Sequence, residues 1–248
     1  MGMYSELAPF YDALTGDVDY GAFADFYEKV FRLYDRKPKL LLDLACGTGT
    51  LTYMLAERGY EMIGVDGSTD MLTQAYEKAA ESNAEIKPIF INQTLSKLDL
   101  YGTVDGAICC LDGMNYIEPE DIEEAIRRVN LFLEPGGVFV FDINSPFKLR
   151  GLDGQMFVDE TDDVFCVWRA ELLEEENCCC YGMDIFSRNG DLWKREEEEH
   201  YEFLYTPAFL KQTMEAAGFI DIRIFGELTF EQPESDEKRI FIAGRKPF

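Results

Sequence analysis

The sequence predicts an α/β protein with a parallel sheet and, later in the chain, a smaller antiparallel part. The stretch KLLLDLACGTGTLT, residues 39–52, consists of a short apolar run, a glycine turn and the start of a helix. Strand, turn and helix in that order are typical of parallel α/β units, whose strands are buried on both faces. Over residues 147–205 the apolar residues change to an alternating period, which indicates antiparallel strands.

The first part of the chain is predicted to be a helical lid, residues 1–36, in front of that core. Apolar residues fall at helical spacing over residues 3–34, with a break around Gly16. Most of these apolar residues are explained if the lid helices pack through their own aromatic side chains.

The glycine turn is the part of the sequence with the clearest chemical content. The apolar run over residues 40–42 suits a buried strand and is closed by Asp43. Gly47 and Gly49 then open a turn before a helix predicted over residues 51–58. A glycine carries no Cβ, so the backbone can come very close to a ligand here.

The acids around this turn indicate what kind of ligand it serves. A dinucleotide fingerprint needs a third glycine, and Thr52 stands at that position. Asp43 would repel phosphates and attract a cation, while Asp66, at the end of the next strand, can accept the hydroxyls of a ribose. A nucleoside with a positive charge and no phosphate fits, as in S-adenosylmethionine. The alternatives are a glycine turn in some other α/β protein and an NAD-dependent dehydrogenase with an irregular fingerprint.

The remaining elements follow in order. Ser68 is a predicted helix N-cap. Further strands are predicted over residues 86–91, 104–111, 219–225 and 239–243, with helices from Pro119 to before residue 135 and from Thr206 to Gly218. Within residues 147–205 we predict about four strands, a tight turn at Asn189-Gly190, and one polar face that includes residues 196–199.

Composition bounds the function. The 248 residues carry 48 acids against 23 bases, a formal charge of −25, so we expect no nucleic-acid partner and an attraction for cationic small molecules. Seven cysteines show no metal-ligand spacing, so we expect no metal site. No apolar run approaches the roughly 20 residues that span a bilayer, and MGMYSELAPFYD is unlike a signal peptide. We therefore expect a cytoplasmic protein without a membrane partner.

Several motifs together resemble a known family. LLLDLACGTGTL is similar to the first motif of the class I S-adenosylmethionine-dependent methyltransferases, GVDGSTDML to the second, and LEPGGVFVFDI to the entry of strand five. The opening YDALTGDVDYGAFADFY resembles the leader of small bacterial methyltransferases of unassigned substrate. The resemblance implies a Rossmann-like, seven-stranded, mostly parallel sheet with helices on both faces, and S-adenosylmethionine as cofactor.

The resemblance also implies cofactor contacts. In the family the leader often folds over the cofactor, which makes Tyr11 and Tyr20 candidates. An acid after strand three commonly contacts the adenine, but here Gln93 and Thr94 stand in its place, and which of them replaces it stays open. The expected cofactor-binding residues are Tyr11, Tyr20, Asp43, Ala45, Cys46, Gly47, Gly49, Asp66, Gly67, Met71, Gln93, Thr94 and Leu111.

The expected reaction is in-line methyl transfer to nitrogen or oxygen of a small molecule, possibly an amine. We expect the core, residues 1–146 and 206–248, to hold the cofactor and residues 147–205 to cover the acceptor. His200, the only histidine, and Asp112, at the sheet's carboxyl edge, are the catalytic candidates; Asp112, Arg169 and Tyr181 are the substrate-binding ones. A packed or surface histidine is the alternative for His200, and a non-catalytic S-adenosylmethionine-binding sensor or partner-binding module is the alternative function.

Overall fold

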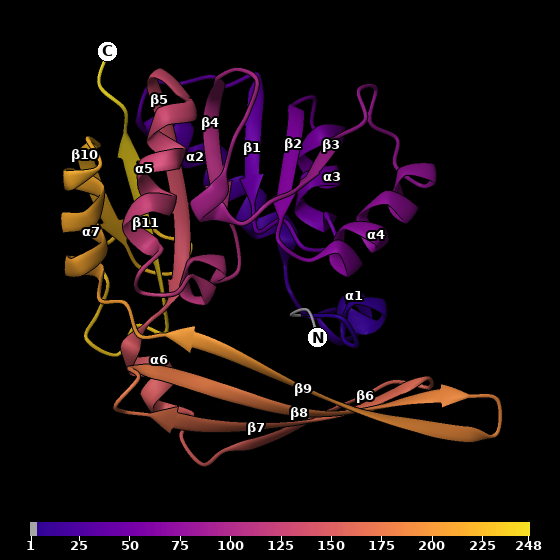
Figure 1. The fold of residues 1–248 in the computed structure, drawn as a ribbon. Helices are drawn as coiled ribbons and strands as arrows, with labels where there is room; N and C mark the ends of the chain where they lie inside the picture. The colour runs from indigo at the N-terminus through magenta and orange to yellow at the C-terminus, as the bar shows by residue number, and fades with distance from the viewer. Residues whose placement is uncertain (1–3) are drawn as a thin grey trace.

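The computed structural model describes residues 4–248, so the first three residues of the predicted lid lie outside it. Its centre is a seven-stranded sheet in the order β10-β11-β5-β4-β1-β2-β3 (Figure 1). Neighbouring strands from β3 to β5 run parallel, whereas β11 is antiparallel to both β5 and β10. The predicted Rossmann-like, mostly parallel sheet is thereby confirmed. The strands are β1 (Leu40–Leu44), β2 (Glu61–Asp66), β3 (Ile89–Asn92), β4 (Val104–Cys109), β5 (Leu133–Asn144), β10 (Ile220–Phe225) and β11 (Arg239–Arg245).

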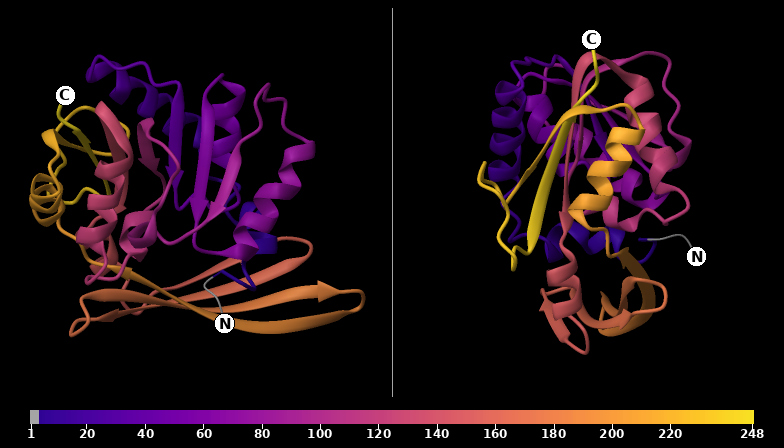
Figure 2. Two further views of the ribbon diagram at one scale, coloured as in Figure 1. Left: turned by 45° about the horizontal axis from the view of Figure 1, so that its top comes forward. Right: turned by 90° about the vertical axis from the view of Figure 1, so that its left-hand side faces the viewer.

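Helices cover both faces of this sheet, as Figure 2 shows. One apolar core joins strand residues such as Leu42 to α5 and α7, and a second joins Leu41 on the other face to α2 and α3. The strands are therefore buried on both faces, which is why their sequences are continuous apolar runs. The helices are α1 (Tyr11–Leu14), α2 (Tyr20–Leu33), α3 (Thr50–Glu57), α4 (Thr69–Glu77), α5 (Ile122–Phe132), α6 (Pro146–Gly151) and α7 (Pro207–Ala216).

The observed bounds of three elements differ from those predicted from the sequence. The strand predicted over residues 86–91 begins only at Ile89, since Pro88 before it has no N–H to donate to a sheet. The helix expected from Pro119 begins at Ile122, because residues 118–121 form a hydrogen-bonded turn. The first lid helix is reduced to a 3₁₀ turn (Ala8–Phe10) and the single turn α1.

A second sheet contains four antiparallel strands in the order β6-β7-β8-β9. These strands are β6 (Met156–Glu160), β7 (Val164–Leu173), β8 (Cys178–Asn189) and β9 (Leu192–Phe203). The second sheet lies below the carboxyl ends of β1 and β2, with the leader (residues 4–19) between the two sheets (Figures 1 and 2). Leu7 of the leader is buried against Val164 and Met183 of the second sheet.

The predicted polar face of the second sheet needs a correction. Along β9 the buried residues are Glu198, His200 and Glu202, whereas Glu199 and Tyr201 between them are exposed. Successive residues of a strand point to opposite faces, so this acidic run divides between solvent and the interior. Only every second residue of this run therefore faces solvent.

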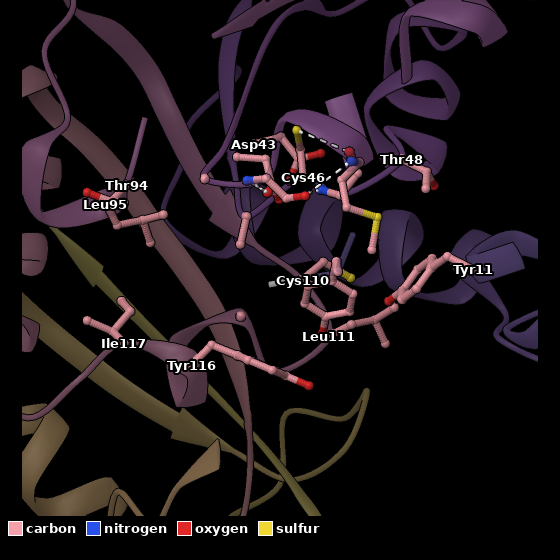
Figure 3. Close-up of a pocket in the computed structure, with 18 of the residues that line it drawn as sticks. Tyr11, Asp43, Cys46, Thr48, Thr94, Leu95, Cys110, Leu111, Tyr116 and Ile117 are labelled. Carbon is pink, nitrogen blue, oxygen red and sulfur yellow. Dashed lines mark hydrogen bonds between the residues drawn. The ribbon is translucent and has the colours of Figure 1, made fainter. Parts of the chain in front are cut away.

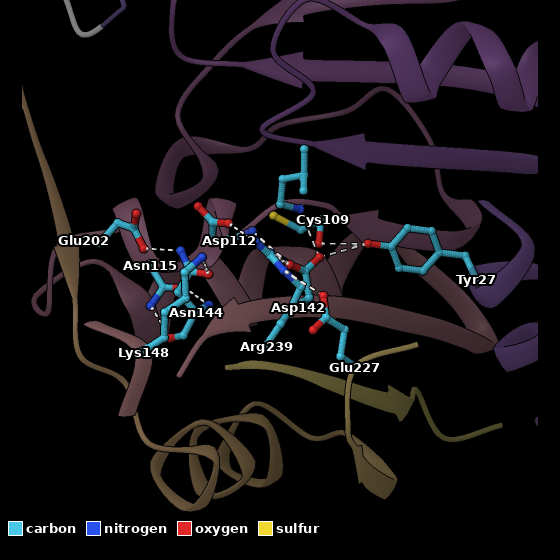
Figure 4. A network of polar contacts seen from close by, with 11 residues as sticks. Tyr27, Cys109, Asp112, Asn115, Asp142, Asn144, Lys148, Glu202, Glu227 and Arg239 are labelled. Carbon is cyan, nitrogen blue, oxygen red and sulfur yellow. Dashed lines mark hydrogen bonds and ion pairs between the residues drawn. The ribbon is translucent and has the colours of Figure 1, made fainter. Parts of the chain in front are cut away.

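A buried carboxylate, Asp142 of β5, holds the turn that follows β4 (Figure 4). Its two oxygens accept the backbone N–H groups of Leu111 and Asp112 at 2.9 and 3.0 Å. The hydroxyl of Tyr27 also donates to it at 3.1 Å, and Arg239 forms an ion pair with it. Leu111 and Asp112 have φ values of 54° and 56°, a left-handed conformation that costs about 1 kcal/mol or more for each such residue. Asp142 therefore fixes a strained turn.

We expect Asp142→Ala to lower the free energy of unfolding by about 3–5 kcal/mol, because two backbone N–H groups lose their acceptor and the buried Arg239 guanidinium loses one of its carboxylate partners. Urea denaturation of the variant measures this loss. Asp162→Ala, at an exposed turn, is the matched control and should change the stability by less than about 0.5 kcal/mol. A loss below about 1 kcal/mol for Asp142→Ala would contradict this role.

Candidate functional site

A cavity of about 590 Å³ opens at the carboxyl ends of the parallel strands, under the leader (Figure 3). Ligands of open α/β sheets bind at this edge. Eleven of the thirteen predicted cofactor-binding residues line the cavity, namely Tyr11, Tyr20, Asp43, Ala45, Cys46, Gly47, Asp66, Gly67, Met71, Thr94 and Leu111. The other two, Gly49 and Gln93, do not.

The two glycines of the turn have different roles. Gly47 has a φ of 55°, and a Cβ placed on it would meet no atom within 4 Å, so its open side faces space that a ligand can use. Gly49 also has a positive φ, but its Cβ would lie 3.0 Å from the Phe90 ring and 3.2 Å from the Ala75 side chain. Gly49 is thus needed for packing of α3 against α4 and β3, and it does not line the cavity.

Asp66 is fixed at the end of β2 by the glycine turn itself. The backbone N–H of Gly47 donates to one of its oxygens at 2.8 Å, and that of Ser68 to the other at 2.7 Å. Burial raises the pKa of Asp66, and these two hydrogen bonds oppose the rise. Each oxygen keeps a further lone pair that can accept a hydroxyl of a ligand.

Asp43, at the end of the neighbouring strand β1, is almost completely buried. The hydroxyl of Thr52 donates to it at 2.5 Å, so the residue that breaks the dinucleotide fingerprint serves as a hydrogen-bond partner. Burial raises the pKa of Asp43, the hydrogen bond from Thr52 opposes the rise and the charge of Asp66 adds to it, and the resulting pKa is about 7. Two desolvated carboxylates in one cavity favour a cationic ligand.

Beside Asp66, at the end of β3, the structure separates the two candidates for the adenine contact. The amide of Gln93 points away and is paired with the backbone of Asp99, accepting its N–H at 3.0 Å and donating to its C=O at 3.3 Å. Thr94 lines the cavity instead, together with Leu95 and Ser96. Of the two candidates, Thr94 is therefore the one placed to contact a ligand, while the polar atoms of Gln93 have partners in the chain.

The leader is held over the cavity by polar contacts at both ends. Asp12 accepts the hydroxyl of Thr48, in the glycine turn, at 2.6 Å and pairs with Lys78 at 2.6 Å. Glu198 of β9 accepts the backbone N–H of Glu6 at 3.0 Å. The leader is thereby tied to the glycine turn and to the second sheet.

The four catalytic and substrate-binding candidates do not line the cavity. Asp112 pairs with Arg239 at 2.9 Å, although its neighbours Leu111 and Gly113 are lining residues. Arg169 is half exposed and pairs with Asp184 within the second sheet, which removes it from the candidate site. Tyr181, on β8, packs against the apolar cluster that contains Leu149 and Leu204.

His200 lies behind the cavity wall. It is 2% exposed, and its ring meets that of Tyr4 edge-on at 4.1 Å between centroids. Its Nε2 lies 3.5 Å from a carboxylate oxygen of Glu198, and its ring also lies beside that of Tyr116. Tyr4 and Tyr116, which the sequence analysis missed, line the cavity, so His200 reaches it only through them.

Comparison with known proteins agrees with this geometry. The family model described as "Methyltransferase domain" matches residues 41–137. The protein YqeM of Bacillus subtilis is 28% identical, covering 98% of this chain and 97% of that protein. A demethylmenaquinone methyltransferase of Thermus thermophilus is 34% identical over 88% of this chain and 91% of its own length. The chain belongs to the class I S-adenosylmethionine-dependent methyltransferases.

A solved S-adenosylmethionine-dependent methyltransferase from Clostridium acetobutylicum supports the same assignment, with a TM-score of 0.85, 30% identity and 99% coverage of both chains. S-adenosylmethionine is thus the cofactor of this methyltransferase, and the cavity suits it. Gly47 leaves room at the turn, and Asp43 and Asp66 supply negative charge beside a cationic nucleoside. The dehydrogenase alternative is set aside by the family assignment.

Two negative findings apply to residues 4–248 of this methyltransferase. They contain no group of three or more His, Cys, Asp or Glu side chains that could hold a metal ion. In the same part of the chain no helix has the length and apolar character needed to cross a membrane.

Asp66→Ala should weaken S-adenosylmethionine binding by about 2–4 kcal/mol, because the ribose hydroxyls and the N–H of Gly47 lose a charged acceptor. Titration calorimetry gives the dissociation constant directly. Asp162→Ala should leave that constant unchanged. Equal affinities of wild type and Asp66→Ala would show that the ribose lies elsewhere.

The affinity for S-adenosylmethionine should also depend on pH through Asp43. Its pKa of about 7 in the free protein means that the carboxyl is largely protonated below pH 7, and the cationic cofactor favours the ionised form. The dissociation constant should therefore rise as pH falls from 8 to 6. In Asp43→Asn, which keeps an acceptor for Thr52, affinity should be lower at pH 8 and the pH dependence smaller. Parallel pH profiles of the two proteins would exclude Asp43.

Proposed function

We propose that this protein transfers the methyl group of S-adenosylmethionine to nitrogen or oxygen of a small molecule. The observation that carries the proposal is the cover over the cavity: leader residues Tyr4 and Tyr11 line it, and the second sheet packs against the leader. A cavity of about 590 Å³ that must also hold the cofactor leaves room for a small acceptor. The relative from Thermus thermophilus, named for demethylmenaquinone, supports a small-molecule acceptor.

In this proposal the core, residues 1–146 and 206–248, holds the cofactor, and residues 147–205 with the leader enclose the acceptor. Methyl transfer needs little assistance from the side chains, since the leaving group of the sulfonium is a neutral thioether. The chain contributes alignment of the acceptor with the methyl–sulfur bond and exclusion of water. The tyrosine faces beside the cavity also stabilise a cation, by about 0.5–2 kcal/mol for each suitable ring.

We propose further that the acceptor is an amine or another cationic molecule. The lining includes the acids Glu118 and Asp121 at the cavity's open side, in addition to Asp43 and Asp66. A formal charge of −25 raises the local concentration of cations around the whole protein.

The experiment is a turnover assay with S-adenosylmethionine and a fractionated bacterial metabolite extract. We expect formation of S-adenosylhomocysteine that depends on one low-molecular-mass fraction, and a product heavier by one methyl group. Gly47→Val is the matched inactive control, because its side chain enters the space beside the turn at a backbone conformation that disfavours β-branched residues.

Tight S-adenosylmethionine binding with no S-adenosylhomocysteine from any fraction would contradict the proposal and favour a non-catalytic binding protein. Turnover that requires a macromolecular fraction would contradict the small-molecule acceptor.

A further inference from the structure

Two carboxylates from different parts of the chain meet beside the cavity. Glu202 of β9 is 3% exposed, and its carboxylate is directed by Asn144, whose amide donates to it at 2.7 Å (Figure 4). Asp112 follows β4, and Arg239 fixes it at 2.9 Å. Burial raises the pKa of Glu202 to about 8, and the charge of Asp112 contributes to that rise. A chain of hydrogen bonds through Asn144 and Asn115 joins Glu202 to the backbone of Asp112, and the charge of Asp112 opposes ionisation of Glu202.

The charges of this pair also act on three tyrosines. Burial raises the pKa of Tyr4, Tyr116 and Tyr181, and the charges of Glu202 and Asp112 raise each of them further. Tyr4 and Tyr116 line the cavity, and Tyr181 comes from β8 of the second sheet. The pair therefore lies directly behind the tyrosine wall, on the side of the cavity that faces the second sheet.

The charge of Glu202 has no cationic partner among the described residues. The ammonium group of Lys148 lies nearby but contacts the Asn144 side-chain oxygen, at 2.7 Å. Arg239 is shared between Asp112 and Asp142, and no ion pair in residues 4–248 includes Glu202. A buried carboxylate without a cation is costly, so the site suits a cation that arrives with a ligand. With only two carboxylates present it lacks the donor set of a metal site, which leaves an organic cation.

We propose that Glu202 and Asp112 bind the ammonium group of the acceptor, and that Glu202 selects an amine over a neutral molecule of the same shape. This rests on the proposed function, because it assumes that the acceptor occupies the second-sheet side of the cavity. Entry of the ammonium requires only that the Tyr4 and Tyr116 side chains move apart, and their ring faces then add cation–π attraction. Tyr181 and Asn144 keep the Glu202 carboxylate in place.

The pH dependence of amine binding follows from the groups that face Glu202. These are Asp112, which raises its pKa, Lys148 and Tyr181, which lower it, and the neutral Asn144. A carboxyl that titrates near pH 8 is mostly protonated at pH 6.5 and mostly ionised at pH 8.5. An alkylamine, like lysine, stays protonated to about pH 10. The affinity for an alkylamine should therefore rise several-fold between pH 6.5 and 8.5.

The test compares cyclohexylamine with cyclohexanol, which has nearly the same shape and no charge. Each is titrated into the full-length protein saturated with S-adenosylhomocysteine at pH 8.5, and binding is followed by ligand-observed NMR. We expect the amine to bind at least about tenfold more tightly than the alcohol. Glu202→Gln keeps the acceptor for Asn144 and should remove that preference. Glu199→Gln, on the exposed face of the same strand, is the matched control and should retain it.

Equal binding of amine and alcohol to the wild type, or an unchanged preference in Glu202→Gln, would overturn the proposal. Binding of S-adenosylhomocysteine to Glu202→Gln, measured in the same samples, reports whether that variant is folded. If it is not, the wild-type pH series decides, and an amine affinity that stays flat from pH 6.5 to 8.5 would overturn the proposal. Turnover of a neutral acceptor from the extract, without a preference for amines, would leave the methyltransferase function standing and remove only the role of Glu202.

Discussion

The contact of Asp142 with the turn after β4 is the constraint on which the acceptor side of the molecule depends. One buried carboxylate accepts two consecutive backbone N–H groups and so holds Leu111 and Asp112 in a left-handed conformation. That conformation turns the chain back toward the cavity, so that Leu111 and Gly113 line it. The same carboxylate anchors Arg239 of β11, which then fixes Asp112. The antiparallel edge of the sheet therefore contributes to the site without lining it.

Several carboxyl groups at and beside the cavity are buried away from water. Asp43, Asp66 and Glu202 are all buried enough for their pKa values to rise, which means that ionising these carboxyl groups in the free protein costs free energy. A cationic ligand relieves that cost, because it replaces the water that burial removed. Relief of this cost contributes to the free energy with which a cationic cofactor binds.

The cofactor half of the site could be predicted from the sequence because its determinants are local. Asp43, Gly47 and Asp66 lie at the ends of two adjacent strands, and parallel strand ends meet at one edge. The two predicted residues that do not line the cavity are held by contacts without a sequence signature. Gly49 is required by Phe90, and Gln93 is held by the backbone of Asp99.

The residues on the proposed acceptor side were largely missed, because they come from three separate segments of the chain. Tyr4 lies in the leader, Tyr116 follows β4, and Glu202 lies near the end of β9. Of these three residues, only Glu202 lies in a sequence pattern that indicates its position. In EEEEHYEF a period of two places Glu198, His200 and Glu202 on one face, but the acidic run looked like a solvated surface. The apolar face of β7 and β8 had to be buried against something, and that partner, Leu7 of the leader, carries its neighbour Tyr4 to the cavity.

The leader thereby couples the two halves of the site. Its Asp12 is bound to Thr48 and Lys78 beside the cofactor, while its Glu6 backbone is bound to Glu198 of the second sheet. Tyr4 and Tyr11 lie between these anchors and line the cavity. A shift of the second sheet relative to the core must therefore move the tyrosines that cover the cofactor. In the proposed function the antiparallel strands therefore act on the reaction through the leader, because their own candidate residues lie behind the cavity wall.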